Sequence, residues 1–157
     1  MIGHRPSILI TDDDRGFREA LRGVLDPHFG THVAADGEEA LRIVCTRTVH
    51  LVLLDMHMPK LTGLETLRIV KQHFATLPCI LMSAEADERL RREAAAARAF
   101  AVLTKPVSGR RVTHAVARAL QSTYRWPLEQ RLASRLGLAP SGDHESPDEG
   151  DEIGRLA

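Results

Sequence analysis

Short apolar runs alternate with amphipathic stretches over most of the chain. Each run is continuous in aliphatic residues, as in strands that are buried on both faces of a parallel sheet. The runs predict strands at 7–11, 32–35, 51–54, 79–82 and 100–104. Between and after them, apolar residues recur at helical spacing and predict helices at about 17–25, 40–44, 64–74, 85–98 and 112–120.

Strict alternation of strand and helix indicates βαβ crossovers and therefore a parallel sheet with helices on both faces. The expected fold class is α/β, a doubly wound five-stranded sheet in the flavodoxin-like order 2-1-3-4-5. Local signals agree with this division: Asp14 can cap the first helix, and Pro59 ends the third strand in a loop.

Polar residues stand directly after four of the predicted strands: Asp12 and Asp13, then Asp55, Ser83 and Lys105. A parallel sheet brings the carboxyl ends of its strands to one edge, where ligands bind in such folds. Taken alone, an acid at a strand end can simply cap a turn. Three carboxylates gathered together, however, need a cation, and oxygen-only ligands favour Mg²⁺. With a lysine and a hydroxyl nearby, the set predicts phosphoryl transfer onto or off the central carboxylate, Asp55.

Composition limits the other function classes. Hydrophobic residues make up 43% of the chain and aromatic residues 4%, so the core is expected to be aliphatic. Cys45 and Cys79 lie in apolar segments without metal-binding spacing and are expected to be buried, reduced thiols of a cytoplasmic protein. No apolar run approaches the roughly 20 residues that span a bilayer, so no membrane partner is expected.

The formal net charge of zero hides a division along the chain. Residues 1–139 contain 20 Lys and Arg against 15 acids, whereas residues 140–157 contain one Arg against six acids. The acidic end is rich in Pro, Gly and Ser and is expected to be a disordered tail.

We therefore expect three parts: a main domain at 1–121, a short helical extension at 122–139 and the tail at 140–157. A helix at about 127–137 either packs on the domain or engages a partner.

Five segments together resemble the receiver domain of two-component response regulators, in the right order and with similar spacing. They are Ile8–Asp14, Asp36–Leu41, Leu53–Pro59 with Gly63, Met82–Ala84 and Leu103–Pro106. The resemblance covers the chain from about Ser7 to Gln121. It implies a module that accepts a phosphoryl group from a sensor histidine kinase or a histidine phosphotransfer protein and has no further enzyme activity.

The resemblance implies a role for each matching acid. Asp55 is similar to the phosphoacceptor. Asp12 and Asp13 are similar to the pair that holds Mg²⁺ together with Asp55 and the backbone carbonyl of His57.

The resemblance also implies roles around the phosphoryl group. Ser83 is similar to the switch hydroxyl and Lys105 to the phosphate-binding lysine, which precedes a cis bond to Pro106. The side chains of His57 and Glu85 occupy the positions that tune how long the phosphoryl group lasts. A loop histidine that faces solvent is the plainer interpretation of His57, and a metal-ligand role for its side chain is the alternative.

The chain departs from the family pattern three residues before Lys105. Receivers usually have Tyr or Phe there as the aromatic switch, and this chain has Val102. By strand alternation, Phe100 is expected on the same side of the sheet as Val102 and is a candidate substitute. Thr62 replaces the usual Asp or Ser before Gly63.

Two other functions stay open beside the phosphorylated receiver. Val102 leaves room for a phosphate-independent binding module on the same fold, and the acidic cluster alone would suit a Mg²⁺-dependent phosphohydrolase. The expected output surface comprises the helix at 85–98, the strand at 100–104 and the helix at 112–120, through which a partner or a second copy would bind. Nucleic-acid binding is not expected, because about 35 residues after the receiver are too few for a DNA-binding domain.

Overall fold

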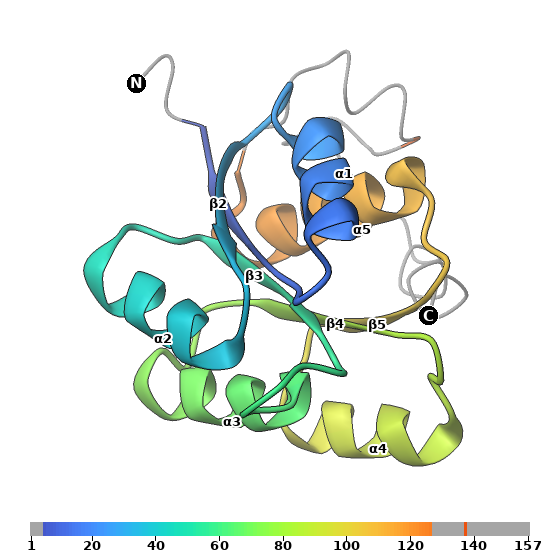
Figure 1. Ribbon diagram of the computed structural model, residues 1–157. Helices are drawn as coiled ribbons and strands as arrows, with labels where there is room; N and C mark the ends of the chain where they lie inside the picture. Colours follow the sequence, from blue (N-terminus) through green and yellow to red (C-terminus); the bar gives the residue numbers. More distant parts are fainter. Residues whose placement is uncertain (1–4, 127–136, 138–157) are drawn as a thin grey trace.

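A parallel five-stranded sheet forms the centre of the molecule (Figure 1). The computed structural model of the chain describes residues 5–126 and Gly137. The strand order is β2-β1-β3-β4-β5, so the predicted doubly wound fold and its strand order are confirmed. The strands in chain order are β1 Ser7–Thr11, β2 Gly30–Ala34, β3 Leu51–Asp55, β4 Cys79–Ser83 and β5 Ala101–Thr104.

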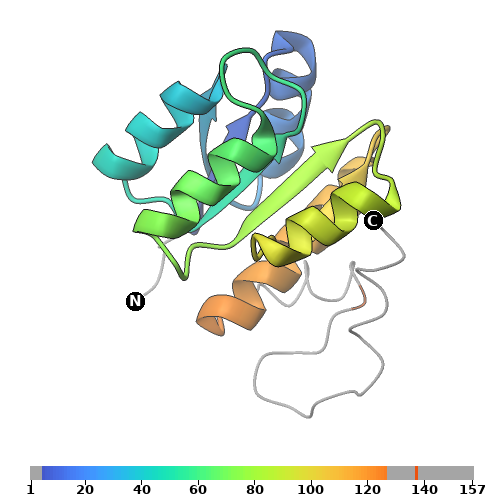
Figure 2. The same cartoon turned by 90° about the horizontal axis from the view of Figure 1, so that it is seen from below.

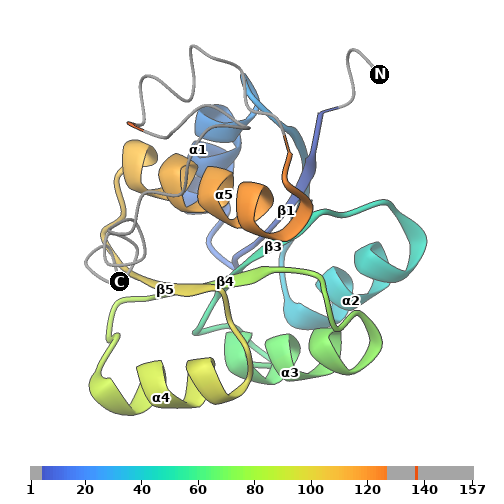
Figure 3. The same ribbon diagram turned by 180° about the vertical axis from the view of Figure 1, so that it is seen from behind.

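Helices cover both faces of the sheet. Two of them, α1 and α5, pack on one face, and α2, α3 and α4 pack on the other (Figure 3). Seen from below, α3 and α4 lie next to each other on their shared face (Figure 2). The helices are α1 Arg15–Leu25, α2 Gly37–Thr46, α3 Gly63–His73, α4 Glu88–Ala96 and α5 Gly109–Tyr124.

The central strand β3 explains why the apolar runs are continuous. All five of its residues are buried. Leu51 and Leu53 point into the core under α1 and α5, whereas Val52 and Leu54 point into the core under α2, α3 and α4. Since successive side chains of a strand point to opposite faces, a strand covered on both faces needs apolar residues at every position. The apolar run ends at Asp55, where the sheet reaches its carboxyl edge.

Each of the helices α1 to α5 begins directly after a short polar side chain that accepts a backbone N–H of the first turn. These N-caps are Asp14, Asp36, Thr62, Asp87 and Ser108. At α3 the cap is reciprocal, because Glu65 also accepts the backbone N–H of Thr62. Thr62 therefore does the capping work expected of the Asp or Ser it replaces.

Several predicted boundaries shift, and one burial prediction is wrong. Helix α4 begins at Glu88 rather than near 85, since Asp87 caps it. Strand β2 begins at Gly30, before the predicted residue 32. Cys45 is exposed, not buried, whereas Cys79 is buried as expected. Cys45 follows the inward-facing Val44 on α2, and one helical step turns it outward.

The expected extension at 122–139 and the acidic tail at 140–157 lie almost wholly outside the described residues. Helix α5 itself runs on to Tyr124, past the predicted domain boundary at residue 121. In the described part of the chain, no helix is long and apolar enough to cross a membrane.

Candidate functional site

The strand register brings the predicted polar residues to one edge of the sheet. Asp55 is the last residue of β3 and pairs with Met82, and Ser83, the last residue of β4, pairs with Thr104 of β5. Lys105 follows directly, and its backbone N–H donates to the carbonyl oxygen of Ser83 (2.9 Å). Residues that are distant in sequence thus meet because parallel strands end together.

A lysine lies between two buried acids in this site. Lys105 Nζ is 2.9 Å from Asp55 Oδ1 and 3.1 Å from Asp12 Oδ2. The side chain of Asp12 is 1% exposed and that of Asp55 7%, whereas Lys105 keeps 22%. The ammonium group also lies over the ring of Phe17, 4.1 Å from its centroid. The lysine therefore neutralises part of the charge that three neighbouring carboxylates would otherwise leave uncompensated.

Asp12 is held in place on several sides. Its Oδ1 accepts the backbone N–H of Asp14 (2.8 Å), and its carbonyl oxygen accepts a hydrogen bond from Arg18 Nη1 (2.7 Å). Its own backbone N–H donates to the carbonyl oxygen of Ala34 on β2 (3.1 Å). These contacts fix Asp12 relative to the start of α1 and restrict the orientation of its carboxylate.

The pKa values of Asp55 and Lys105 are both raised, but for different reasons. Burial raises the pKa of Asp55 above its ordinary value, although the hydrogen bond from Lys105 works in the opposite direction, and the charge of Asp12 adds to the rise. For Lys105, burial opposes the charged form, but the hydrogen bonds to Asp55 and Asp12 outweigh it and raise its pKa. The lysine therefore stays charged, and Asp55 is a more basic and less solvated carboxylate than an exposed one.

Three carboxylates offer a set of oxygen ligands. Asp12, Asp13 and Asp55 each have an oxygen within 4.8 Å of the others, and Asp13 is exposed while the other two are buried. Opposite ligands of an octahedral Mg²⁺ are roughly 4.2 Å apart, twice the ion's ligand distance. The three acids are therefore close enough together to share one Mg²⁺ as oxygen ligands, with water on the exposed side.

A hollow of about 220 Å³ opens beside the site, between the loops that follow β3 and β4. Its lining includes His57, Ser83 and Glu85. Ser83 is fully buried and its Oγ accepts the backbone N–H of Glu85 (3.1 Å), whereas His57 and Glu85 are exposed. The Ser83 hydroxyl therefore lies beside the site, and the exposed side chains of His57 and Glu85 lie at the opening of the hollow.

The expectation for Phe100 is wrong. Val102 is 6% exposed and belongs to the core under α2, α3 and α4, whereas Phe100 packs on the opposite core, under α1 and α5. Strand β5 begins at Ala101. Phe100 thus precedes the strand, and side-chain alternation does not apply to it. It cannot stand in for an aromatic residue at position 102.

Two contributors to the site, Phe17 and Arg18, do not follow from the sequence pattern. Phe17 is predicted only as an apolar helix residue and no role is predicted for Arg18; both lie in the first turn of α1, whose cap adjoins Asp12 and Asp13. Gly63 matters because a Cβ there would stand 2.4 Å from the carbonyl oxygen of Asp55. The start of α3 can therefore pack against the end of β3 only with glycine. The peptide bond between Lys105 and Pro106 is cis.

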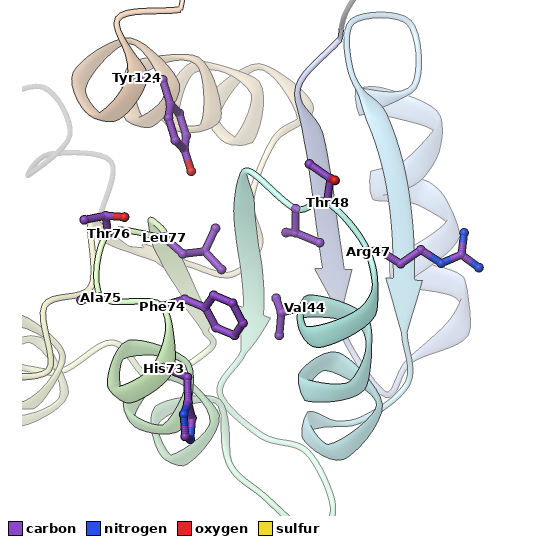
Figure 4. A pocket seen from close by; sticks show the side chains of 10 residues that line it. Val44, Arg47, Thr48, His73, Phe74, Ala75, Thr76, Leu77 and Tyr124 are labelled. Atoms are coloured by element: carbon purple, nitrogen blue, oxygen red, sulfur yellow. The ribbon is translucent and has the colours of Figure 1, made fainter.

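A second hollow, of about 490 Å³, lies at the opposite edge of the sheet, between the carboxyl ends of α2, α3 and α5. Val44, Phe74 and Leu77 meet in it, and the hydroxyl of Tyr124 points toward it (Figure 4). None of its lining residues is acidic. The acidic cluster that the sequence predicts therefore does not extend to this hollow.

Comparison with known proteins agrees with this fold. Residues 8–117 match the family described as the response regulator receiver domain. Among curated proteins, the transcriptional regulatory protein CpxR of Klebsiella pneumoniae is 35% identical over 125 residues, which cover 79% of this chain and 53% of that protein. The sensor histidine kinase TmoS of Ectopseudomonas mendocina is 32% identical over 106 residues, 66% of this chain but 11% of that protein. The chain thus spans about half or less of these relatives.

Solved structures of isolated domains match at nearly full length. The signal receiver domain of an HD domain-containing protein from Pseudomonas fluorescens has a TM-score of 0.74 and 26% identity, and the match covers 78% of this chain and 100% of that one. The receiver domain of NtrX from Brucella abortus has a TM-score of 0.69 and 29% identity, covering 73% and 98%.

Proposed function

Because the chain belongs to the response regulator receiver domain family, we propose that it accepts a phosphoryl group on Asp55 and transmits the signal by binding another protein. Receiver domains are signalling modules rather than enzymes, and they interact with histidine kinases and output domains. They bind Mg²⁺ at an acidic pocket. The observation that carries the proposal is the meeting of Asp55 with Asp12, Asp13 and Lys105 at one sheet edge.

Asp55 is the nucleophile in this proposal. An oxygen of its carboxylate attacks the phosphorus of a phosphohistidine, the P–N bond breaks, and the imidazole nitrogen leaves with the electron pair. Burial favours this role, because it destabilises the ionised carboxylate, raises its pKa and so makes it more basic. Water later attacks the aspartyl phosphate and releases inorganic phosphate.

The neighbours of Asp55 stabilise the phosphoryl oxygens. Asp12, Asp13, Asp55 and the backbone carbonyl of His57 would hold Mg²⁺, which when bound offsets negative charge on the oxygens. Lys105 Nζ already contacts Asp55. After transfer it donates a hydrogen bond to the oxygens of the phosphoryl group on Asp55.

Three further side chains act later in the proposal. The Ser83 hydroxyl turns from the backbone of Glu85 to the phosphoryl group. The exposed side chains of His57 and Glu85 set how fast water reaches the phosphorus.

The donor is a sensor histidine kinase or a histidine phosphotransfer protein, and the output surface is formed by α4, β5 and α5. Both free cysteines suit the reducing cytoplasm. A homodimer through the same surface is a second form that this output can take.

The test is incubation of the full chain with Mg²⁺ and acetyl phosphate, followed by intact-mass measurement. We expect one phosphoryl group per chain, none in Asp55→Asn, and wild-type labelling in Asp26→Asn, an exposed acid at the far end of α1. Omission of Mg²⁺ should prevent labelling. No mass gain in the wild type, or the same gain in Asp55→Asn, would refute the proposal.

A phosphate-independent binding module is the second candidate, and Val102 favours it. The aromatic reporter is missing there, and Phe100 is on the other side of the sheet. A partner that binds the unmodified chain and Asp55→Asn equally well would support this candidate over the first. The phosphohydrolase alternative would require turnover of free phosphate esters, for which the site offers no further acid or base in contact with Asp55 among the described residues.

A further inference from the structure

Phe17 contacts more than the core that its helix covers. It lies one turn before Leu21 and therefore on the same side of α1. Leu21 and Leu25 are buried in the core under α1 and α5, whereas Phe17 packs against the margin of that core and stays partly exposed. The ammonium group of Lys105 lies over its ring, 4.1 Å from the centroid. Core packing thus explains only part of the contacts of this side chain.

The contact between Phe17 and Lys105 has the geometry of a cation–π interaction. A charged amine within about 6 Å of a ring centroid is attracted by the negative face of the ring. The attraction grows as the cation loses water, and the side chain of Lys105 keeps only 22% of its surface exposed. The ring therefore helps to hold the lysine as well as filling space at the margin of the core.

The lysine needs several contacts to stay in one place. Its ammonium group stands on a flexible four-carbon stem, which has many rotamers when nothing holds its end. Nζ lies 2.9 Å from Asp55 Oδ1 and 3.1 Å from Asp12 Oδ2. Two acids and one ring, from three different parts of the chain, therefore contact the same ammonium group.

Phe17 is itself held by the segment that carries the acids of the site. Its backbone N–H donates to Asp14 Oδ1 (3.1 Å), and the backbone N–H of Asp14 donates to Asp12 Oδ1 (2.8 Å). The next residue, Arg18, donates from Nη1 to the carbonyl oxygen of Asp12 (2.7 Å). The backbone of Phe17 is thus fixed relative to Asp12, which is the support that a residue needs to orient a flexible neighbour.

Resting on the proposed function, in which Asp55 accepts the phosphoryl group, we propose that Phe17 is a positioning residue for this transfer. Its ring holds the ammonium group of Lys105 at the place where the phosphoryl oxygens arrive. A cation that is in place before the reaction stabilises the developing charge without reorganisation. Without the ring, the lysine spends less time in that position, and transfer becomes slower.

Time courses of phosphorylation test the role of the ring. The full chain, Phe17→Leu and Phe17→Tyr are incubated with saturating Mg²⁺ and acetyl phosphate, and intact-mass measurement gives the rate of labelling. Cation–π contacts correspond to a factor of about 2–5 at exposed sites and about 30 where the cation is desolvated. Since Lys105 lies between these limits, we expect Phe17→Leu to be labelled about three- to tenfold more slowly than the wild type. Phe17→Tyr keeps the ring and should be labelled at close to the wild-type rate.

The affinity for Mg²⁺ separates positioning of the lysine from damage to the site. Phenylalanine offers no oxygen ligand, so Phe17→Leu should bind Mg²⁺ with the wild-type dissociation constant in a calorimetric titration. A packing defect at the start of α1 would instead displace Asp12 and Asp13 and weaken Mg²⁺ binding together with labelling. Phe74→Leu, the same exchange at an exposed phenylalanine of the second hollow, is the matched control and should be labelled at the wild-type rate.

A double-mutant cycle shows whether the ring acts through the lysine. The wild type, Phe17→Leu, Lys105→Ala and the double variant are unfolded in urea with EDTA, where no phosphoryl group is transferred. Alanine at 105 removes the cation without a new contact to the ring, as such a cycle requires. Phe17→Leu should raise the equilibrium constant of unfolding about three- to tenfold more when Lys105 is present than when it is absent.

Equal labelling rates of Phe17→Leu and the wild type would overturn the role of the ring, as would weaker Mg²⁺ binding in proportion to the slower labelling. An effect of Phe17→Leu on unfolding that is the same with and without Lys105 would also overturn it. These outcomes leave a labelled wild type and hence the proposed function intact. A wild type that is never labelled refutes the proposed function itself, and the positioning role with it.

Discussion

Replacement of Lys105 by methionine tests the electrostatic arrangement of the site most directly. The substitution keeps an unbranched side chain of similar length over Phe17 but removes the ammonium group. Asp55 and Asp12 then lose their contacts of 2.9 Å and 3.1 Å, and both carboxylates are buried. The folded state is left with a cluster of acids and no cation, so the free energy of unfolding should fall at neutral pH.

The size of the loss follows from burial. Removal of one member of a buried ion pair typically costs about 3–5 kcal/mol, because the other charge stays buried and unpaired. Lys105 keeps 22% of its side chain exposed, and Asp13 beside it is open to solvent. Solvent screening reduces the effect, so we expect a loss of about 2–3 kcal/mol without metal.

Magnesium should reduce the difference in the free energy of unfolding between Lys105→Met and the wild type. An ion at a hundred times its dissociation constant adds about 2.7 kcal/mol to a folded state that binds it. The variant no longer has a positive charge that repels the ion, and its three carboxylates remain. Its gain from Mg²⁺ should therefore exceed that of the wild type.

The assay is urea unfolding at pH 7, followed by circular dichroism, with EDTA and with Mg²⁺. Lys60→Met is the matched control: Lys60 also lies near two acids, Asp36 and Glu38, at 3.5 Å and 3.4 Å, but its side chain is 56% exposed. It should change stability little. The reasoning fails if Lys105→Met is as stable as Lys60→Met in EDTA, or if Mg²⁺ stabilises both variants equally.

Three further changes test other contacts. Asp55→Asn should raise the free energy of unfolding at pH 7, because burial raises the pKa of Asp55 and the ionised form destabilises the fold; titration from pH 7 toward 4 should then stabilise the wild type relative to the variant, and parallel curves would contradict this. Gly63→Ala should cost about 3 kcal/mol in urea unfolding, since its Cβ would meet the Asp55 carbonyl oxygen at 2.4 Å, whereas Gly23→Ala, with nothing within 4 Å, should gain about 0.5–1 kcal/mol. His50 accepts a backbone N–H at Nδ1 and burial lowers its pKa, so wild-type stability should fall as pH drops below about 6.5, and His50→Gln should show a flatter dependence between pH 8 and 5.5.

The convergence of the site followed from the sequence because it depends on local signals. Continuous apolar runs predict buried strands, and the residue after each run must lie at the carboxyl edge of a parallel sheet. Asp12, Asp55 and Lys105 meet there although Asp12 and Lys105 are 93 positions apart in sequence. No side-chain geometry was needed for that step.

Features that depend on how side chains reach across elements did not follow from the sequence. The position of Phe17 over the lysine depends on the angle of α1, and the double pairing of Lys105 depends on the reach of a flexible side chain. Phe100 was expected on the wrong side because β5 begins at Ala101, so Phe100 lies before the strand, where side-chain alternation does not apply.

The resting contacts of Lys105 also constrain how a signal can leave the site. A phosphoryl group on Asp55 would draw the lysine away from Asp12, and the backbone of Lys105 is hydrogen-bonded to Ser83 at the end of β4. With Val102 inside the core and Phe100 on the opposite side, no aromatic ring of β5 is available to rotate between two positions. The displacement must therefore pass through the paired ends of β4 and β5 and the helices that follow them. It would arrive at the surface of α4 and α5, two helices that carry six arginines and only two acids, Glu88 and Glu93.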